Sequence, residues 1–310
     1  MSADRSWDAL LNPGEAQEFF VAPNRAGLCL ELDAPGFRPV NAWWLAELSR
    51  LIYRKDGDEE GKNALAPARR EILEDAGFEE VARFAKGETY GALVVAGGAA
   101  RGPSGRRRVG ILVFRGTNSP RDWLTNIRIN QGRAVGEGLV HDGFFDALHE
   151  VWDEVRNAIR SLGGPYFCTG HSLGAALATV AAARLSRTAM APHSVYTFGS
   201  PRVGNGAFAA SLEGRGLFRV VNGSDCVVRA PPSIGTLDYC HAGELHALEP
   251  SAGLDRESSD SSAFDDEVCD GEGTLSAFRE MFDVRTWFEP PSYLSDHAPV
   301  NYVARLARLL

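Results

Sequence analysis

The sequence of 310 residues has few cysteines, no excess of basic residues and no apolar run long enough to span a membrane. The five cysteines are an odd number without close spacing, which argues against both a disulfide framework and a zinc site. The net charge of −9 argues against a general nucleic-acid binder, since such proteins neutralise phosphates with clustered lysine and arginine. The longest stretch of low charge, residues 173–183, is far shorter than the roughly 20 residues that a membrane-spanning helix requires.

The N-terminus, MSADRSWD, contains no basic region followed by an apolar run, so it does not have the pattern of a Sec signal peptide. Together with the reduced thiols that the cysteine spacing suggests, this predicts a cytoplasmic protein and leaves open export by a route without that signal. The composition, 44% apolar and 24% charged, is that of an ordinary globular protein. The sequence gives no indication of the oligomeric state.

Acidic residues are concentrated in one segment of the chain. Between residues 251 and 273, eight acidic residues accompany a single arginine and several serines. Such a segment holds few groups that a core could bury, so we predict an acidic, flexible insertion at about residues 249–275. Residues 1–37 show no sustained periodicity and are interpreted as a peripheral N-terminal arm.

The spacing of apolar residues predicts alternating helices and strands. Helical spacing occurs at residues 41–53, 64–84 (broken near Gly77) and 144–162, and in segments that end near residues 187 and 212. Strand-like runs occur at 91–96, 109–114, 166–169, 194–198, 218–221 and within 239–248. Residues 292–296 are expected to be extended and to precede a terminal helix. This alternation predicts an α/β fold with a mostly parallel central sheet and helices on both faces.

The segment Tyr166–Ala176, YFCTGHSLGAA, has the strongest functional signal in the chain. A strand-like run leads directly into Gly-x-Ser-x-Gly and then into a helix rich in Ala and Leu, which is the context of a nucleophile elbow. Gly170 and Gly174 avoid side chains that would collide at so sharp a turn. Ser172 then projects at a helix N-terminus, where free amides favour an anion. We predict that Ser172 is a nucleophile and that its neighbour His171 has a packing role.

A serine hydroxyl needs a base and an orienting acid, and after such an elbow they follow in the order Ser, Asp or Glu, His. Asp225 lies just beyond the apolar run 218–221, at the carboxyl edge where open parallel sheets place their sites. The alternative is that Asp225 caps a turn after Asn222-Gly223-Ser224.

Four histidines follow Ser172 in the sequence: His193, His241, His246 and His297. We favour His297 as the base, because it opens the terminal helix on a loop that can bend toward the sheet edge. On chain order alone His241 remains a rival. Asp296, beside His297, is expected to cap the terminal helix.

Acyl transfer also needs donors for the developing oxyanion. One is the backbone amide of Leu173, directly after the nucleophile, and the second should follow an earlier strand. Phe114-Arg115-Gly116-Thr117 ends such a strand, and Thr117 offers an amide and a hydroxyl. The alternative is an ordinary glycine turn.

Taken together, these residues resemble the class 3 lipases, the fungal-lipase-like branch of the α/β-hydrolases. The segments that carry the resemblance are FRGT at 114–117, VHDGF at 140–144, GHSLG at 170–174, TFGSPRVGN at 197–205, Asp225, and YCHAGE at 239–244. The resemblance extends from about residue 40 to 305 and implies an α/β-hydrolase domain at residues 38–310. The resemblance also places His241 in a strand, which makes His241 a weaker candidate for the base.

The resemblance implies a Ser172, Asp225 and His297 triad with Thr117 and Leu173 as oxyanion donors. It further implies a short amphipathic lid at about residues 119–127, whose Trp123 and Leu124 would meet lipid when the lid opens. Secreted members of the family have a signal peptide and disulfides that this sequence lacks. The acidic insertion between Asp225 and His297 would disfavour anionic lipid surfaces.

The expected function is that of a carboxylic-ester hydrolase, a triacylglycerol lipase or esterase, that acts through an acyl-enzyme without metal or organic cofactor. Its expected partners are an ester or lipid substrate and, transiently, a lipid interface, with no nucleic acid. A phospholipase or acyltransferase on the same triad is a second hypothesis. A non-catalytic member that binds a lipid or a partner protein is a third.

Overall fold

The computed structural model describes residues 6, 13–22, 29–32, 36–54, 67–102, 105–117, 130–233, 235–248 and 292–310. The predicted lid at 119–127, with Trp123 and Leu124, lies outside the described residues, and so does the predicted acidic insertion at 249–275.

The centre of the molecule is a sheet of eight strands in the order β1-β3-β4-β7-β8-β9-β10, with β2 paired to β3. The strands are β1 (Leu30–Glu31), β2 (Phe78–Lys86), β3 (Thr89–Gly102), β4 (Gly105–Phe114), β7 (Tyr166–His171), β8 (Ser194–Phe198), β9 (Leu217–Asn222) and β10 (Glu244–Leu248). β3 is antiparallel to β2 and β4, whereas β4, β7, β8, β9 and β10 run parallel. A separate antiparallel pair consists of β5 (Gln131–Val135) and β6 (Gly138–His141).

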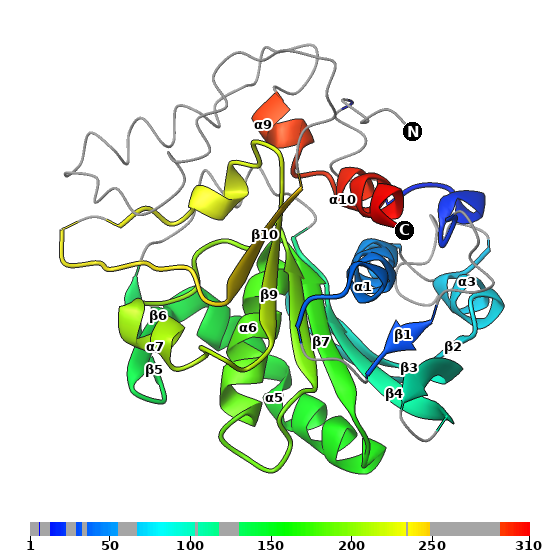
Figure 1. Cartoon of the computed structure of the whole chain (residues 1–310). Helices are drawn as coiled ribbons and strands as arrows, with labels where there is room; N and C mark the ends of the chain where they lie inside the picture. The colour runs from blue at the N-terminus through cyan, green and yellow to red at the C-terminus, as the bar shows by residue number, and fades with distance from the viewer. Residues whose placement is uncertain are drawn as a thin grey trace.

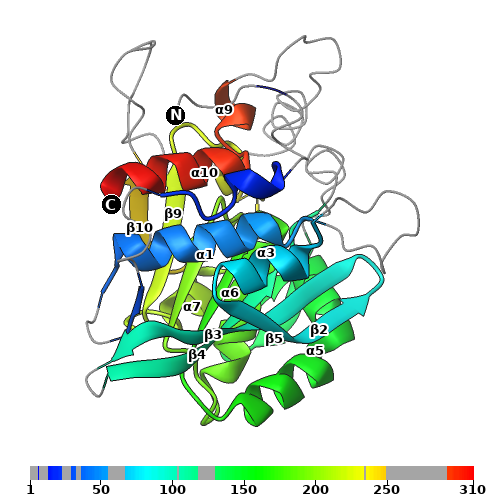
Figure 2. The same ribbon diagram turned by 90° about the vertical axis from the view of Figure 1, so that its right-hand side faces the viewer.

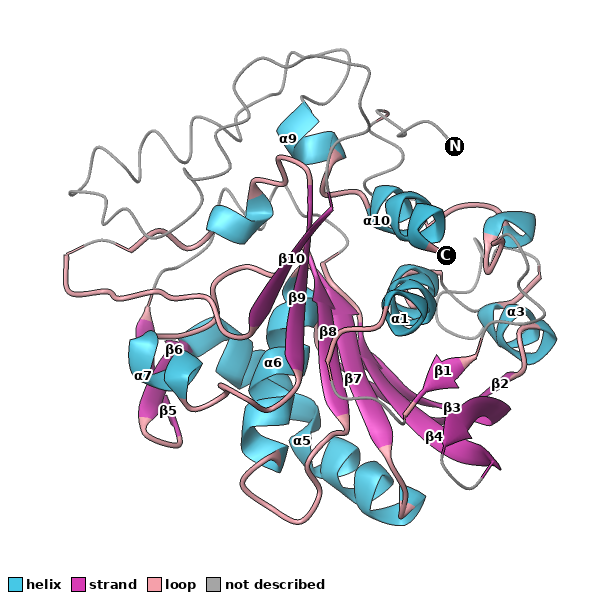
Figure 3. Cartoon of the chain, in the orientation of Figure 1, coloured by secondary structure: helices cyan, strands magenta, loops and turns pink. Residues whose placement is uncertain are grey.

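Helices cover both faces of the sheet. The helical elements are η2 (Ala16–Glu18), α1 (Pro39–Leu51), α3 (Arg69–Asp75), α5 (Asp142–Leu162), α6 (Leu173–Leu185), α7 (Gly206–Ala210), η4 (Val227–Arg229), α9 (Ser292–Ser295), α10 (Pro299–Leu306) and η6 (Ala307–Leu309). Helices α1 and α10 lie on one face, and α5 and α6 lie on the other (Figures 1 and 2). The predicted α/β fold with a mostly parallel sheet and helices on both faces is therefore confirmed, and Figure 3 shows these layers.

Two apolar clusters, one on each face of the sheet, form the core. On the first face α1 contributes Trp43 and Trp44, and Trp44 packs against Phe20 with ring centroids 5.6 Å apart. Phe20 belongs to the predicted N-terminal arm, as does β1, which pairs in parallel with β3. On the second face α5 and α6 pack together through residues such as Leu148 and Ala178. Within the described ranges, no helix is long and apolar enough to cross a membrane.

Two sequence predictions of secondary structure are wrong. The stretch 64–84 was expected to be helical, but after α3 it continues as the strand β2, because residues 78–86 pair with β3 instead. Residues 292–296 were expected to be extended, but 292–295 form the helical turn α9. In both places long-range contacts override the local pattern.

The carboxyl ends of the parallel strands lie at the same edge of the sheet. In the register of the sheet, Phe114 of β4 pairs with Gly170 of β7, and His171 pairs with Phe198 of β8. The loops that follow β4, β7, β8 and β9 therefore start side by side, as expected for a binding edge in an open parallel sheet.

Candidate active site

Ser172 occupies a strained turn between β7 and α6. Its φ of 59° and ψ of −128° lie in a region that side chains other than glycine rarely adopt. A Cβ on Gly170 would overlap the backbone of Gly174, so the sharp turn requires glycine there. The backbone N–H of Ser172 donates to the carbonyl of Phe198 at 3.0 Å, which ties the turn to the end of β8. The local structure is that of the nucleophile elbow that the sequence predicts.

Asp225 and His297 form a buried pair, although they lie 72 residues apart in the chain. His297 Nδ1 lies 2.8 Å from Asp225 Oδ2, and the two side chains are 1% and 0% exposed. Because a carboxylate accepts, Nδ1 carries the proton and Nε2 of His297 is left as an acceptor. Asp225 comes from the loop after β9, and His297 comes from the loop between α9 and α10.

Ser172 and His297 are brought to the same edge of the sheet. His171, the residue next to Ser172, has its ring centroid 4.5 Å from that of His297. Both Ser172 Oγ and His297 Nε2 are buried and have no hydrogen-bond partner among the described residues. Buried polar atoms of this kind are rare unless a role requires them. The geometry leaves a serine hydroxyl and an imidazole acceptor available for each other or for a substrate.

The two predicted oxyanion donors also lie near the elbow. Leu173 is the first residue of α6, where backbone N–H groups have no acceptor within the helix. Thr117 follows the end of β4. This end packs closely against the elbow, since a Cβ added to Gly116 would lie only 2.8 Å from the carbonyl oxygen of His171.

The other three histidines that follow Ser172 have different surroundings. His241, the rival base, hydrogen-bonds the backbone of Val228, and its burial, helped by Arg219 and Arg202, holds its pKa well below the usual value. His246 pairs with Glu244 at 2.9 Å on β10 and stacks on Phe37. His193 is exposed ahead of β8.

Asp296 does not cap the terminal helix, so that expectation is wrong. The N-cap of α10 is Ala298, without a side-chain cap. Asp296 Oδ2 instead accepts from the backbone N–H and the hydroxyl of Ser224, at 2.8 and 3.0 Å, and Oδ1 accepts from Arg305. Asp296 thus joins the loop of His297 to the loop of Asp225.

Two tyrosines at the site were missed from the sequence. Tyr302 on α10 donates its hydroxyl to Asp225 Oδ2 at 2.6 Å, and the hydroxyl of Tyr53, just after α1, lies 3.0 Å from His171 Nδ1. Burial, followed by the charge of Asp225, raises the pKa of Tyr302 well above its usual value, so this hydroxyl remains a donor. No local motif marks either residue, because their partners lie 77 and 118 residues away.

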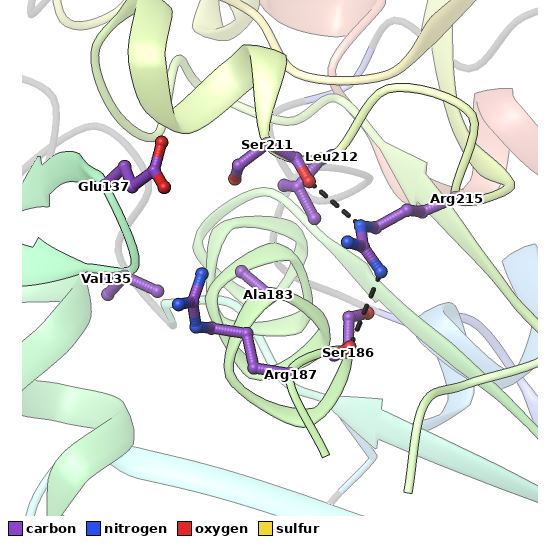
Figure 4. A pocket seen from close by; sticks show the side chains of 8 residues that line it. All are labelled: Val135, Glu137, Ala183, Ser186, Arg187, Ser211, Leu212 and Arg215. Atoms are coloured by element: carbon purple, nitrogen blue, oxygen red, sulfur yellow. Dashed lines mark hydrogen bonds between the residues drawn. The ribbon is translucent and has the colours of Figure 1, made fainter. Parts of the chain in front are cut away.

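A cavity of about 220 Å³ lies elsewhere, beside the C-terminal end of α6 (Figure 4). Its lining includes Arg215, which donates to the backbone oxygens of Ser211 and Ser186. Ser172 precedes the opposite end of the same helix, so this cavity is separate from the predicted site. Among the described residues, no three His, Cys, Asp or Glu side chains gather as a metal centre requires.

The fold and this arrangement define the class of protein: an α/β-hydrolase with an Asp–His pair beside a nucleophile elbow. A solved structure, MDLA from Penicillium cyclopium, has the same fold with a TM-score of 0.55; the match is 22% identical and covers 83% of this chain and 96% of that chain. The model of one family, Lipase (class 3), matches residues 111–234, so this part of the chain is similar to the class 3 lipases.

Relatives of known name extend this result. The chain is 36% identical over 170 residues to the secreted mono- and diacylglycerol lipase 1 of Fusarium solani, covering 52% of this chain and 49% of the relative. It is 36% identical over 154 residues to the chloroplastic phospholipase A(1) DAD1 of Arabidopsis thaliana, covering 41% and 34%. The matched region thus spans from about a third to about half the length of these relatives.

The cytoplasmic location predicted from the sequence is wrong by these comparisons. The fungal relative is secreted and the plant relative is chloroplastic. The prediction was based on the first residues and on the cysteine spacing. Neither feature is sufficient to identify the compartment.

Proposed function

We propose that this chain is a serine hydrolase that cleaves carboxylic esters of lipids through an acyl-enzyme on Ser172. The observation that carries the proposal is the buried Asp225–His297 pair, whose free Nε2 lies at the sheet edge that also holds the strained elbow of Ser172. The names of the relatives, an acylglycerol lipase and a phospholipase, support an acyl ester as the substrate.

In the first half of the reaction, Ser172 Oγ attacks the carbonyl carbon of the ester while its proton passes to His297 Nε2. Asp225 orients the imidazolium that forms. The amide of Leu173 and Thr117 donate to the oxyanion of the tetrahedral intermediate. When the intermediate collapses, the ester C–O bond breaks and His297 returns the proton to the leaving alkoxide.

In the second half, His297 Nε2 takes a proton from water as the water oxygen attacks the acyl carbon. A second tetrahedral intermediate then releases the fatty acid, and the proton returns to Ser172 Oγ. The same two donors stabilise both oxyanions, so the site needs no rearrangement between the two halves.

The first test is Ser172→Ala, assayed with p-nitrophenyl butyrate and with a fluorophosphonate probe. We expect a loss in kcat on the order of 10⁶, as in other triads that lose the nucleophile. Labelling by the probe should also disappear. Retained hydrolysis in this variant, or a wild-type chain that neither hydrolyses the ester nor reacts with the probe, would refute the proposal.

Phospholipid is a second candidate substrate, because one relative is named a phospholipase A(1). The chain should be given a mixed-acyl phosphatidylcholine and a diacylglycerol of the same acyl composition, with Ser172→Ala as the blank. A lysophospholipid with only the sn-2 acyl chain left would favour this candidate. Hydrolysis of the diacylglycerol alone would favour an acylglycerol lipase.

A further inference from the structure

We propose that Tyr53 and His171 are positioning residues, which hold the loop of His297 and the turn after β4 against the nucleophile elbow. This inference rests on the proposed function. It assigns a role to two buried side chains that the reaction itself does not use.

His171 reaches the loop of His297 through a hydrogen bond of defined direction. Its Nε2 lies 2.7 Å from the backbone oxygen of His297. A carbonyl can only accept, so Nε2 carries the proton. Burial, followed by the nearby His297, keeps the pKa of His171 well below its usual value, so its Nδ1 is a free acceptor.

Tyr53 donates to that acceptor. Its hydroxyl lies 3.0 Å from His171 Nδ1, and the phenol is kept protonated because burial raises its pKa. The same hydroxyl has a backbone hydrogen bond with Gly116, in the turn that leads to Thr117. A Cβ on Gly116 would overlap this hydroxyl oxygen, so the contact between the turn and Tyr53 is close.

These bonds run head to tail through three separate parts of the site. The N–H of Gly116 donates to Tyr53, Tyr53 donates to His171, and His171 donates to the carbonyl of His297. The chain therefore joins the oxyanion side, the elbow and the base. Because the backbone of His297 is held at its carbonyl and its ring is held at Asp225, both ends of this residue are fixed.

The position of Tyr53 depends on how α1 docks on the sheet. Ser49 Oγ on α1 lies 3.1 Å from Thr169 Oγ1 on β7, and both side chains are buried. This contact sets the C-terminal end of α1 over the carboxyl edge of the sheet, where Tyr53 follows it. Figure 2 shows α1 lying across the sheet beside α10.

The neutral state of His171 also matters for the reaction. Its ring lies 4.5 Å from that of His297, which must become an imidazolium during acyl transfer. A second positive charge at that distance would oppose this step. The low-dielectric pocket and the hydroxyl of Tyr53 favour the neutral ring.

The test is Tyr53→Phe, which keeps the aromatic ring and removes the hydroxyl with all its hydrogen bonds. With soluble p-nitrophenyl butyrate we expect kcat to fall about tenfold with KM unchanged within twofold, since small displacements of reacting groups act on the transition state. Labelling of Ser172 by a fluorophosphonate should slow by a similar factor.

The matched control is Tyr166→Phe. Tyr166 is also buried, and its hydroxyl donates to the backbone oxygen of Met190 at 2.6 Å, but it begins β7 at the end opposite to His171. This variant should lose stability and keep the wild-type kcat. If Tyr53→Phe behaves in the same way, the role of Tyr53 is merely structural and the inference is overturned.

If Tyr53→Phe does not fold, His171→Gln and His171→Leu replace it. Gln retains a donor and an acceptor and Leu retains neither, so we expect kcat of the Gln variant to exceed that of the Leu variant about tenfold. Equal values would overturn the inference. A wild-type chain without activity or labelling would instead overturn the proposed function.

Discussion

Asp225 shows how this structure satisfies a fully buried carboxylate. It accepts from His297 Nδ1 and the Tyr302 hydroxyl at Oδ2, and from the backbone N–H of Val227 at Oδ1, with distances of 2.8, 2.6 and 2.9 Å. A carboxylate without water needs such donors, because an unpaired buried charge is costly. Tyr302 is therefore expected to set the orientation of the carboxylate that in turn orients His297.

Tyr302→Phe tests this directly. Removing the hydroxyl should lower the free energy of unfolding by about 1–3 kcal/mol, because Asp225 loses a donor in a buried site. It should also lower kcat, whereas Tyr239→Phe, which removes a buried hydroxyl bonded to the backbone of Asn130, should change stability alone. Urea denaturation and ester hydrolysis measure the two effects. Equal kcat values for the two variants would remove the orienting role.

Thr117 gives a second prediction at the scale of one residue. If its hydroxyl donates to the oxyanion, Thr117→Ala should reduce kcat about 10²-fold, and Thr117→Ser should retain most of the activity. Both variants keep the backbone amide, so the comparison isolates the hydroxyl. A kcat for Thr117→Ala close to the wild-type value would leave only the amide as a donor.

Only part of the site could be read from the sequence. Gly-x-Ser-x-Gly is a local pattern, and Asp225 and His297 follow it in the chain order that the elbow predicts. Tyr53 and Tyr302 have no such pattern, since their roles depend on the docking of α1 and α10 beside the elbow. Asp296 was misread for the same reason: its partner Ser224 lies 72 residues away in the chain.

Among the elements, the turn from β7 to α6 depends most on its exact residues. Gly170→Ala should disturb this turn, because the added methyl group would meet the backbone of Gly174. We expect a loss of about 1–3 kcal/mol in the free energy of unfolding and a large loss of kcat. Gly164→Ala, where the nearest atoms to an added Cβ are 3.9 Å away, is the control that should change neither. Full activity of Gly170→Ala would mean that the elbow can relax.

Strand β2 shows why the spacing of apolar residues predicted the wrong secondary structure. Phe78, Val81 and Phe84 recur every third residue, which favours a helix, yet Val81 is 38% exposed and the segment is a strand. The register shifts between Glu80 and Ala82, so Phe78 packs in the cluster on the α1 face and Phe84 packs in the cluster on the α5 face. A bulge of this kind interrupts the alternation of apolar and polar residues by which a strand is recognised in a sequence.

For the whole molecule, the buried His171 and the half-buried His241 couple folding to pH. Burial lowers the pKa of both His171 and His241 well below the usual 6.5. The nearby His297 lowers the pKa of His171 further, and Arg219 and Arg202 lower that of His241 further. In the unfolded chain both rings bind a proton near pH 6.5, whereas in the fold both remain neutral. Since the unfolded state then binds more protons, the free energy of unfolding must fall as the pH drops below 6.5.

The expected slope is about 1.4 kcal/mol per pH unit for each histidine, once the pH lies below 6.5 and above the pKa values of the folded state. Urea denaturation at pH 7.5, 6.5 and 5.5 measures it, in a window where the ordinary carboxylates stay ionised. His241→Asn should reduce the slope by about 1.4 kcal/mol per pH unit, whatever it does to stability at pH 7.5. An unchanged slope in His241→Asn would mean that its imidazole binds a proton equally well in the folded and unfolded chains.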